Sequence, residues 1–542
     1  MFNRLSRQLA GMFIIMGLFA LFIGPMTYVR AQGNQSEYKV LFKLPIDEEG
    51  VMYSPAGEEM LQWGPKALAV APDGTFIIAN TVANNLLRIN QTGEIIDKID
   101  LSELAVGVTD IETTEEGIFA LDSAAPEPSV LHLTHTGDLI ARYNIPFKEQ
   151  FLISVTGLVL NDNDELFIED RAQITDKLLD STGQLAADEQ GNTGIQAVDG
   201  FSVGGHTIHI PKSSVAQETK HDETILIGGN SVDIAVEQDL GGVQIVGAHS
   251  AKSFYAQVTE LSNDAAGTLL VDTVLHQYSV DGQLLGLARI PLQEQFVRVD
   301  NPIALGENAA YALLTEPEYI SVVQLNLYDT LPSILPVKSR QDDKTQEIQH
   351  GESGVNSCSI YRQYISQNAY SYISASKYLN VTNTDGDCAG RSKPRYIGGP
   401  GTYTGVPYDW GGNNTAADYT SAMDDGYKAG NTNTAYGKLG CSRGVDCSGL
   451  VTRAWGRSDK KYGTSTLPEI STALPDQWSL KEGDIMNDFV THVFLIRSID
   501  DGGANVYEST VDAGLDRVVY RYLPWGAFNG FQPNRYNNLC DP

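Results

Sequence analysis

A cysteine and a histidine near the end of the chain have the residue types and surroundings that nucleophilic catalysis requires. Cys447 lies in the run 444–450 (GVDCSGL), between a glycine-flanked turn and an apolar stretch. We expect this cysteine at the first turn of a helix, where backbone N–H groups and the helix dipole favour thiolate over thiol. His492 follows 45 residues later in the strand-like run 491–496 (THVFLI). The two residues predict a Cys–His hydrolase.

His492 is the only one of the nine histidines that lies beyond residue 350. A Cys–His pair in this part of the chain therefore has no other histidine to use as its base. The alternative is a buried strand histidine without a catalytic role, and the cysteine pattern upstream argues against it.

The five cysteines all lie in the last third of the chain: Cys358, Cys388, Cys441, Cys447 and Cys540. An odd number leaves at least one thiol unpaired. If Cys447 is the free nucleophile, the other four can form two disulfides in three possible pairings, and the sequence does not choose among them. The alternative is a bridge between Cys447 and Cys441.

The N-terminus has the pattern of a secretory signal peptide over residues 1–31. Arg4 and Arg7 form a basic region, residues 12–24 form an apolar core, and residues 29–31 (VRA) resemble a cleavage site. The apolar core is shorter than the ~20 residues that a membrane span needs, although an uncleaved anchor is the alternative. We expect the chain after about residue 32 to lie outside the cytoplasm, secreted or in the cell envelope, without a stable membrane anchor.

Composition favours a multidomain globular protein and excludes one class of partner. The chain has 542 residues, of which 42% are hydrophobic, and 68 acidic against 37 basic residues give a formal charge of −31. A nucleic-acid-binding protein needs a basic surface, so we expect no nucleic-acid partner. The same charge argues against tight docking on anionic membranes or cell-wall polymers.

The region after the signal peptide is repetitive. A turn followed by short strands recurs after 43 residues, from Gly74 to Gly117, and after 44 residues, from Gly93 to Gly137. A period in the low forties with four short strands per unit is typical of β-propeller blades. The units resemble those of NHL-type propellers.

The spacing of the repeats predicts about six blades within residues 32–335, with five or seven as alternatives. A third unit opens at residues 163–168, and a late copy occupies residues 277–285. A last blade at about 302–328 is expected to be closed by the N-terminal strand 38–42. Propellers serve in binding, scaffolding and catalysis alike, so this fold alone does not define a function.

No metal or organic cofactor is expected. The histidines His206, His209 and His221 are the only metal-like feature of the propeller. His206 and His209 are three residues apart in an apparent strand, so they face opposite sides of the sheet. We interpret them as structural or surface residues.

A polar, charged stretch at 336–354 is expected to be an exposed linker to a second domain at 355–542. Residues 360–372 and 373–379 have helical patterns and are expected to pack beside the helix that begins at Cys447.

From Tyr408 onward the chain resembles the NlpC-type cell-wall cysteine peptidases, a papain-like family. The resemblance covers about residues 400–530 and rests on four blocks in order: 407–412 (PYDWGG), 446–450 (DCSGL), 480–485 (LKEGDI) and 491–496. It implies an α+β papain-like domain after the all-β propeller. It also implies that Cys447 is the nucleophile and that His492 is its base and later the acid for the leaving amine.

The family places a third polar residue on the strand after the histidine, where it orients the imidazole ring. Here Glu508 matches that position, in place of the usual His, Asn or Gln. Asn505 is the alternative, and because it lies on the opposite strand face only one of the two can point at the ring.

Tyr408 matches a tyrosine that lines the substrate site in the same family, with a core aromatic role as its alternative. Asp446 is expected to cap the helix.

The resemblance implies hydrolysis of amide bonds in peptidoglycan stem peptides, often the bond from γ-D-glutamyl to a diamino acid. The propeller is then a binding or targeting module for a protein or glycan ligand. A long insertion at 413–445 is expected to border the cleft and affects substrate identity most. Two alternatives stay open: an amidase or acyltransferase acting on another substrate, and a non-enzymatic adhesion or scaffold protein with an inactive peptidase-like domain.

Overall fold

A computed structural model describes residues 37–187, 191–211, 222–292, 295–336 and 358–540. The predicted signal peptide at 1–31 and nearly all of the predicted linker at 336–354 lie outside the described residues. Across the described ranges, no helix has both the length and the apolar character needed to span a membrane.

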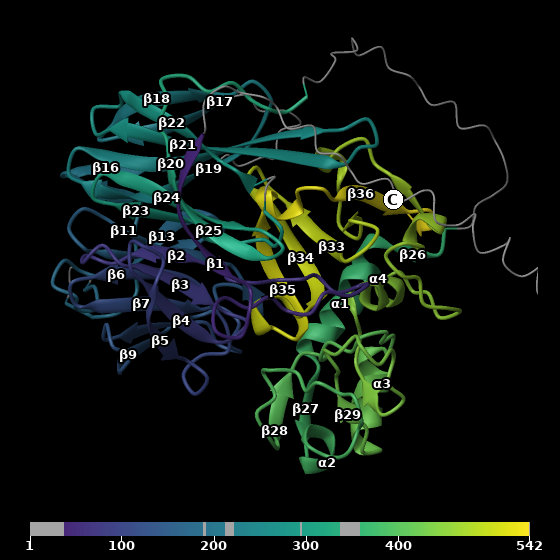
Figure 1. Ribbon diagram of the computed structural model, residues 1–542. Coiled ribbons are helices and arrows are strands. Elements are labelled where there is room, and N and C mark those ends of the chain that lie inside the picture. The colour runs from purple at the N-terminus through teal and green to yellow at the C-terminus, as the bar shows by residue number, and fades with distance from the viewer. Residues whose placement is uncertain (1–36, 188–190, 212–221, 293–294, 337–357, 541–542) are drawn as a thin grey trace, which may run out of the picture. The chain divides into compact units, whose positions relative to one another are not determined.

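Six four-stranded antiparallel sheets form a β-propeller, as the repeat predicts (Figure 1). In chain order the blades are β2 (Leu68–Val70), β3 (Phe76–Asn80), β4 (Asn85–Ile89), β5 (Ile95–Asp100); β6 (Val108–Thr114), β7 (Gly117–Asp122), β8 (Ser129–Leu133), β9 (Leu139–Asn144); β11 (Val155–Leu160), β12 (Leu166–Asp170), β13 (Gln173–Leu179), β14 (Gln196–Ala197); β15 (Phe201–Val203), β16 (His206–His209), β17 (Asp222–Ile227), β18 (Asn230–Ala235); β19 (Asp239–Ser250), β20 (Ser253–Asn263), β21 (Leu269–Ser279), β22 (Leu284–Ile290); and β23 (Ile303–Gly306), β24 (Ala309–Thr315), β25 (Tyr319–Leu325) with β1 (Tyr38–Pro45).

The N-terminal strand closes the ring, which confirms that expectation. Strand β1 pairs antiparallel with β25, from Tyr38 opposite Leu325 to Pro45 opposite Tyr319. The periodic glycines Gly93, Gly137 and Gly282 lie in the turns between the third and fourth strands of their blades, each with φ between 88° and 93°. Side chains disfavour this left-handed backbone, so the repeat in the sequence reflects a repeated turn.

Apolar side chains fill the spaces between neighbouring blades. One cluster joins the first and second blades through Leu86, Ile118 and Leu131, and another joins the sixth and first blades through Leu313 and Leu87. Each blade therefore depends on both neighbours for its core, which is the usual basis of propeller stability.

A cavity of about 420 Å³ lies where the first strands of the blades meet, and β2, β6, β11 and β19 all contribute to its lining. Burial raises the pKa of Asp110 and raises that of Glu169 to about 7. In the described part of the chain no three or more His, Cys, Asp or Glu side chains are grouped to hold a metal ion. His206 and His209 lie at the two ends of β16, and His221 falls outside the described residues.

The chain after residue 358 contains four α-helices, several short strands and most of a larger sheet. The helices are α1 (Arg362–Ser374), α2 (Val381–Thr384), α3 (Ala416–Asp424) and α4 (Cys447–Ala454). The short strands are β26 (Ile360–Tyr361), β27 (Ser376–Leu379), β28 (Gly401–Thr404), β29 (Lys428–Ala429), β30 (Ser442–Arg443) and β37 (Leu539–Cys540). Helix α1 packs beside α4, as expected, but residues 376–379 form β27 paired with β28, so the helical prediction for 373–379 is wrong beyond Ser374.

The larger sheet has the strand order β10-β35-β34-β33-β32-β36-β31. Its members are β31 (Ser471–Ala473), β32 (Ile485–Asn487), β33 (Val493–Ile499), β34 (Gly503–Thr510), β35 (Arg517–Pro524), β36 (Gln532–Tyr536) and β10 (Leu152–Ile153). Strand β10 comes from a loop of the propeller and pairs parallel with β35. The propeller thus contributes one strand to the same sheet as β33, the strand that begins directly after His492.

Two disulfides join Cys358 to Cys540 and Cys388 to Cys441, and Cys447 is free and buried. This selects one of the three pairings left open by the sequence. It also excludes a bridge between Cys447 and Cys441.

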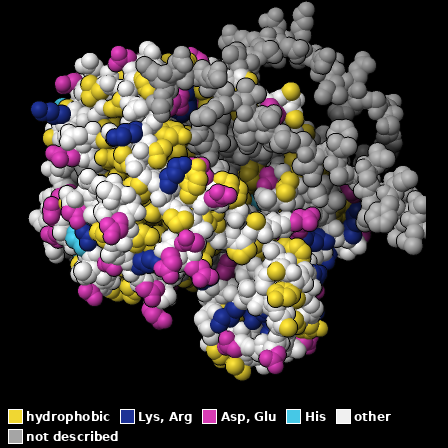
Figure 2. Space-filling model, in the orientation of Figure 1, with side chains coloured by type: hydrophobic (Ala, Val, Ile, Leu, Met, Phe, Trp, Pro, Cys, Tyr) yellow, Lys and Arg dark blue, Asp and Glu magenta, His cyan; other side chains and the backbone are white. Residues whose placement is uncertain are grey.

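On the face that Figure 2 shows, acidic side chains are dispersed among neutral and basic ones, without a broad basic patch.

The Cys388–Cys441 disulfide ties the insertion at 413–445 to the segment after α2. Replacing both cysteines, in Cys388→Ser/Cys441→Ser, is expected to lower the free energy of unfolding by about 2–4 kcal/mol, because the bridge restricts the unfolded chain. Chemical denaturation under non-reducing conditions measures this. An unchanged denaturation midpoint would show that the insertion is ordered without the bridge.

Candidate active site

Cys447 is the first residue of α4, as its sequence context predicts. Asp446 is the N-cap, and its Oδ1 accepts a hydrogen bond of 2.8 Å from the backbone N–H of Gly449. Gly449 packs against the 407–412 block, because a Cβ there would lie 2.3 Å from the carbonyl oxygen of Gly412. Gly449, two residues after the cysteine, therefore allows close contact between two of the four sequence blocks, 446–450 and 407–412.

His492 lies directly before β33, and its ring contacts Glu508 on the neighbouring strand β34. The distance from His492 Nε2 to Glu508 Oε1 is 2.9 Å, and both side chains are buried. Asn505 instead donates a hydrogen bond of 3.0 Å to the hydroxyl of Ser498. Between the two alternatives for the third residue, the structure places Glu508 beside the imidazole ring and directs Asn505 elsewhere.

Glu508 determines which nitrogen of His492 is free to accept a proton. Burial alone would raise the pKa of Glu508, but the Arg521 guanidinium and the His492 ring hold it at about 2. An ionised carboxylate only accepts hydrogen bonds, so Nε2 carries the hydrogen and Nδ1 presents its lone pair. Nδ1 is buried and has no hydrogen-bond partner among the described residues. In this tautomer Nδ1 has a lone pair that can accept a proton.

The thiol of Cys447 is fully buried and lies next to the start of β33. Helix α4 packs on β33, and the backbone N–H of Val493 forms a hydrogen bond that favours the thiolate. Burial nevertheless raises the pKa of Cys447 well above its usual value, and the carboxylates of Asp446 and Glu59 raise it further. These surroundings therefore favour the thiol and oppose the thiolate that the helix N-terminus was expected to stabilise.

The carbonyl group of Glu59, from the propeller half of the chain, occupies the site. The Cys447 thiol donates to the Glu59 carbonyl oxygen at 3.5 Å, and the Tyr408 hydroxyl donates to the same oxygen at 2.8 Å. Tyr408 is 1% exposed. Cys447 and Tyr408, both predicted site residues, are therefore brought together on one carbonyl oxygen. No pattern in the sequence pointed to Glu59, which is 388 residues upstream of the cysteine.

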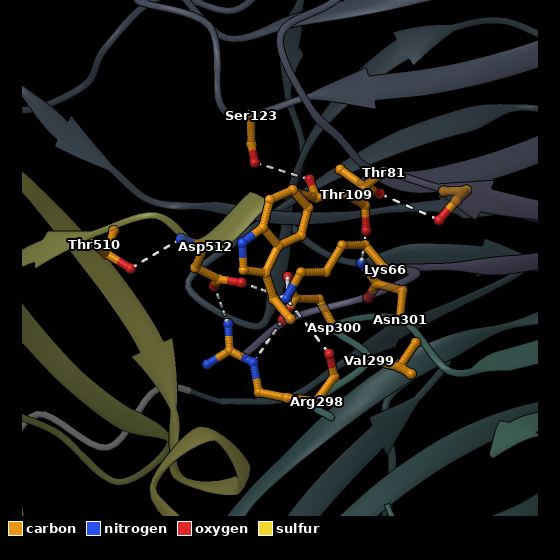
Figure 3. A network of polar contacts seen from close by, with 12 residues as sticks. Lys66, Thr81, Thr109, Ser123, Arg298, Val299, Asp300, Asn301, Thr510 and Asp512 are labelled. Atoms are coloured by element: carbon orange, nitrogen blue, oxygen red, sulfur yellow. Dashed lines mark hydrogen bonds and ion pairs between the residues drawn. The ribbon is translucent and has the colours of Figure 1, made fainter. Parts of the chain in front are cut away.

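A chain of buried charges connects the imidazole to the propeller. Arg521, on β35, binds Glu508 at 2.7 Å and Asp512 at 3.1 Å. Asp512 in turn pairs with Lys66 at 2.6 Å and with Arg298 at 2.9 Å, both from the propeller. Figure 3 shows the Asp512 carboxylate between these two cations. Burial opposes ionisation of Asp512, but its cationic neighbours hold its pKa far below the usual value.

Replacing Glu508 by Gln tests this arrangement through its pH dependence. The folded-state pKa of about 2 lies below the reference value of 4.5, so the folded protein binds fewer protons between these two pH values. The stabilising contribution of Glu508, roughly 3 kcal/mol, is therefore full above about pH 4.5 and is lost as the pH falls towards 2. Denaturation of wild type and Glu508→Gln should differ by several kcal/mol at pH 6–7 and converge near pH 2.

Asn505→Ala is the matched control for Glu508→Gln, since it removes a buried polar side chain from the same strand without touching His492. Its effect on stability is expected to be about 1 kcal/mol and independent of pH. If the free energies of unfolding of wild type and Glu508→Gln differ by the same amount from pH 7 to pH 2, Glu508 is not ionised as described above.

No protein-family model matches the chain, and no curated protein sequence matches it. Solved propeller structures are similar to it in fold. Virginiamycin B lyase from Staphylococcus aureus is 14% identical, with 54% of this chain and 97% of that chain covered and a TM-score of 0.26. A putative gluconolactonase is 12% identical (54% and 98% covered, TM-score 0.28), and the PQQ-bound aldose sugar dehydrogenase from Streptomyces coelicolor is 11% identical (55% and 100% covered, TM-score 0.31). These similarities concern the propeller fold alone.

Proposed function

We propose that the protein is an extracytoplasmic cysteine hydrolase that cleaves amide bonds in peptidoglycan stem peptides. The observation that carries the proposal is the convergence of Cys447 and Tyr408 on one peptide carbonyl oxygen, beside a histidine oriented by Glu508. The resemblance to NlpC-type peptidases supplies the substrate class. The two disulfides support a location outside the cytoplasm, where the predicted signal peptide would direct the chain.

In the proposed reaction, Nδ1 of His492 takes the proton from the Cys447 thiol, and the sulfur attacks the amide carbonyl carbon. The resulting tetrahedral intermediate collapses as His492 gives that proton to the departing amine, which leaves a thioester on Cys447. His492 then removes a proton from water, whose oxygen attacks the thioester. The acid product leaves and the thiol is restored. Glu508 holds the ring in its orientation throughout.

Tyr408 supports the reaction by donating to the carbonyl oxygen. Its hydroxyl already makes a 2.8 Å hydrogen bond to a peptide carbonyl in the structure. A donor that is buried and fixed in this way stabilises the negative charge that develops on the oxygen during attack. Burial raises the pKa of Tyr408 well above its usual value, so the hydroxyl keeps its proton and remains a donor.

The propeller has two proposed roles. It serves as a binding or targeting module for a protein or glycan, as its fold allows. It also supports the site directly, because Lys66 and Arg298 neutralise Asp512, which is connected to His492 through Arg521 and Glu508.

Hydrolysis is tested on purified peptidoglycan and on defined stem peptides, with wild type, Cys447→Ala and His492→Ala. Glu59→Ala is included because it removes the side-chain contacts with Lys461 and Thr464 that hold this segment in the site. New amine termini should form with wild type or Glu59→Ala, and the rate should fall at least about a thousandfold when Cys447 or His492 is replaced in the active background. Intact substrates in every case would contradict the peptidase proposal and favour a scaffold protein. Cleavage that persists in Cys447→Ala would place the nucleophile elsewhere.

Tyr408→Phe isolates the hydroxyl from the aromatic ring. We expect kcat on a stem peptide to fall about 10²–10³-fold with KM nearly unchanged, because the hydroxyl acts on charge that forms only in the transition state. Steady-state kinetics measure both constants. A change confined to KM would assign Tyr408 to packing or substrate binding instead.

A further inference from the structure

The segment that enters the site is part of the connection between β1 and β2. It runs over residues 46–67 and is attached at both ends to propeller strands. Met60 and Trp63 pack with Tyr408 in one apolar cluster, and the indole N–H of Trp410 donates 2.8 Å to the Glu58 carbonyl. The backbone N–H of Glu59 donates to the Val490 carbonyl at 3.1 Å. The segment is thus bound to the walls of the site on both sides of Glu59.

The side chain of Glu59 lies in a corner that is shaped and charged for a carboxylate. Its Oε1 accepts 3.0 Å from the backbone N–H of Thr464, and its Oε2 pairs with the ammonium group of Lys461. A Cβ on Gly463 would lie 2.3 Å from Oε1, so the absence of a side chain there makes room for the carboxylate. Lys461 also pairs with Asp446, the N-cap of α4. The corner is therefore attached to the helix that carries Cys447.

The backbone of Glu59 is held in an unfavourable conformation. Its φ is 57°, a left-handed value that residues with a side chain adopt at an energetic penalty of about 1–2 kcal/mol. The contacts of its carbonyl and its carboxylate compensate for this. The strain and the two specific contacts together indicate that Glu59 binds the site as a ligand does.

We propose that Lys461, the Thr464 N–H and the space above Gly463 form a carboxylate-binding subsite for the residue that donates the acyl group. Glu59 fills this subsite as an internal mimic of a glutamyl substrate. This subsite rests on the proposed function, since only a hydrolase of that kind has an acyl donor. It adds two features to that function: Lys461 selects the substrate by its carboxylate, and the segment carrying Glu59 competes with the substrate for the site.

Glutamyl geometry relates the mimic to a substrate. In Glu59, the atoms Cα, Cβ and Cγ separate the peptide carbonyl carbon from the side-chain carboxylate. A γ-glutamyl amide has the same three carbons between its amide carbonyl and its free α-carboxylate. A glutamyl unit linked through either carboxyl group can therefore place an amide carbonyl at Cys447 and Tyr408 with a carboxylate at Lys461. Glutamine, which is neutral, cannot form the ion pair.

Labelling of Cys447 by iodoacetamide tests whether Glu59 closes the site. The other four cysteines are in disulfides, so without reductant the label reports on Cys447 alone. We expect Glu59→Ala to react at least tenfold faster than wild type. Glu58→Ala is the matched control, because its exposed side chain lies outside the subsite, and it should react like wild type.

Protection from labelling tests the subsite itself in the Glu59→Ala chain. N-acetyl-glutamyl amide is compared with N-acetyl-glutaminyl amide as a protecting ligand. The glutamyl compound should protect at a concentration at least tenfold lower, and this preference should vanish in Glu59→Ala/Lys461→Met. Circular dichroism verifies that each variant is folded.

Equal protection by the two compounds, or equal labelling of wild type and Glu59→Ala, overturns the inference. The labelling needs no turnover, so its outcome is independent of hydrolysis. Glutamyl-selective protection without cleavage of any substrate would overturn the proposed function only. Cleavage without selectivity would overturn the subsite only.

Discussion

Asp512 is a fully buried carboxylate, and the surrounding structure must supply the cations that keep it ionised. Arg521 comes from the same sheet, whereas Lys66 and Arg298 come from the propeller. Removing one partner from such a group leaves a buried charge unpaired, which is strongly destabilising. Because Arg521 also binds Glu508, and Glu508 binds His492, the orientation of the imidazole depends on contacts made by the propeller. The strand β10, which the propeller adds next to β35, fixes the same sheet through backbone hydrogen bonds.

The propeller was predictable because its signal is local and repeated. Gly93 and Gly137 are 44 residues apart since each occupies the same left-handed turn of a blade, and the ring closure by β1 follows from the strand count. The strand at 376–379 was missed because its pairing with β28 depends on residues more than 20 positions away. Pairing of this kind leaves no periodic trace in a short segment.

Within the site, Cys447, His492, Glu508 and Tyr408 were found from local patterns and from a resemblance. Alternation along β34 separated Glu508 from Asn505, as period-2 geometry requires. Glu59, Lys461 and Arg521 were not found, because their contacts form only on folding. Glu59 meets Lys461 across 402 positions of sequence, and Arg521 reaches Glu508 through the pairing of β34 with β35. The same reason explains why the sequence did not reveal the contacts that oppose a thiolate at Cys447. The helix N-terminus is visible in the sequence, but the burial of Cys447 and the carboxylate of Glu59 appear only when the chain folds.

The attachment of residues 46–67 at both ends determines how the site can be opened. A loop held by β1 and β2 stays near the cleft when its central residues dissociate from the site. Its effective concentration there remains on the order of millimolar. A small glutamyl compound below that concentration is outcompeted unless it binds more tightly than the loop. An extended ligand that also contacts the walls beyond Lys461 gains affinity that the loop lacks. Under the proposed subsite, competition with this loop favours ligands by their length as well as by their charge.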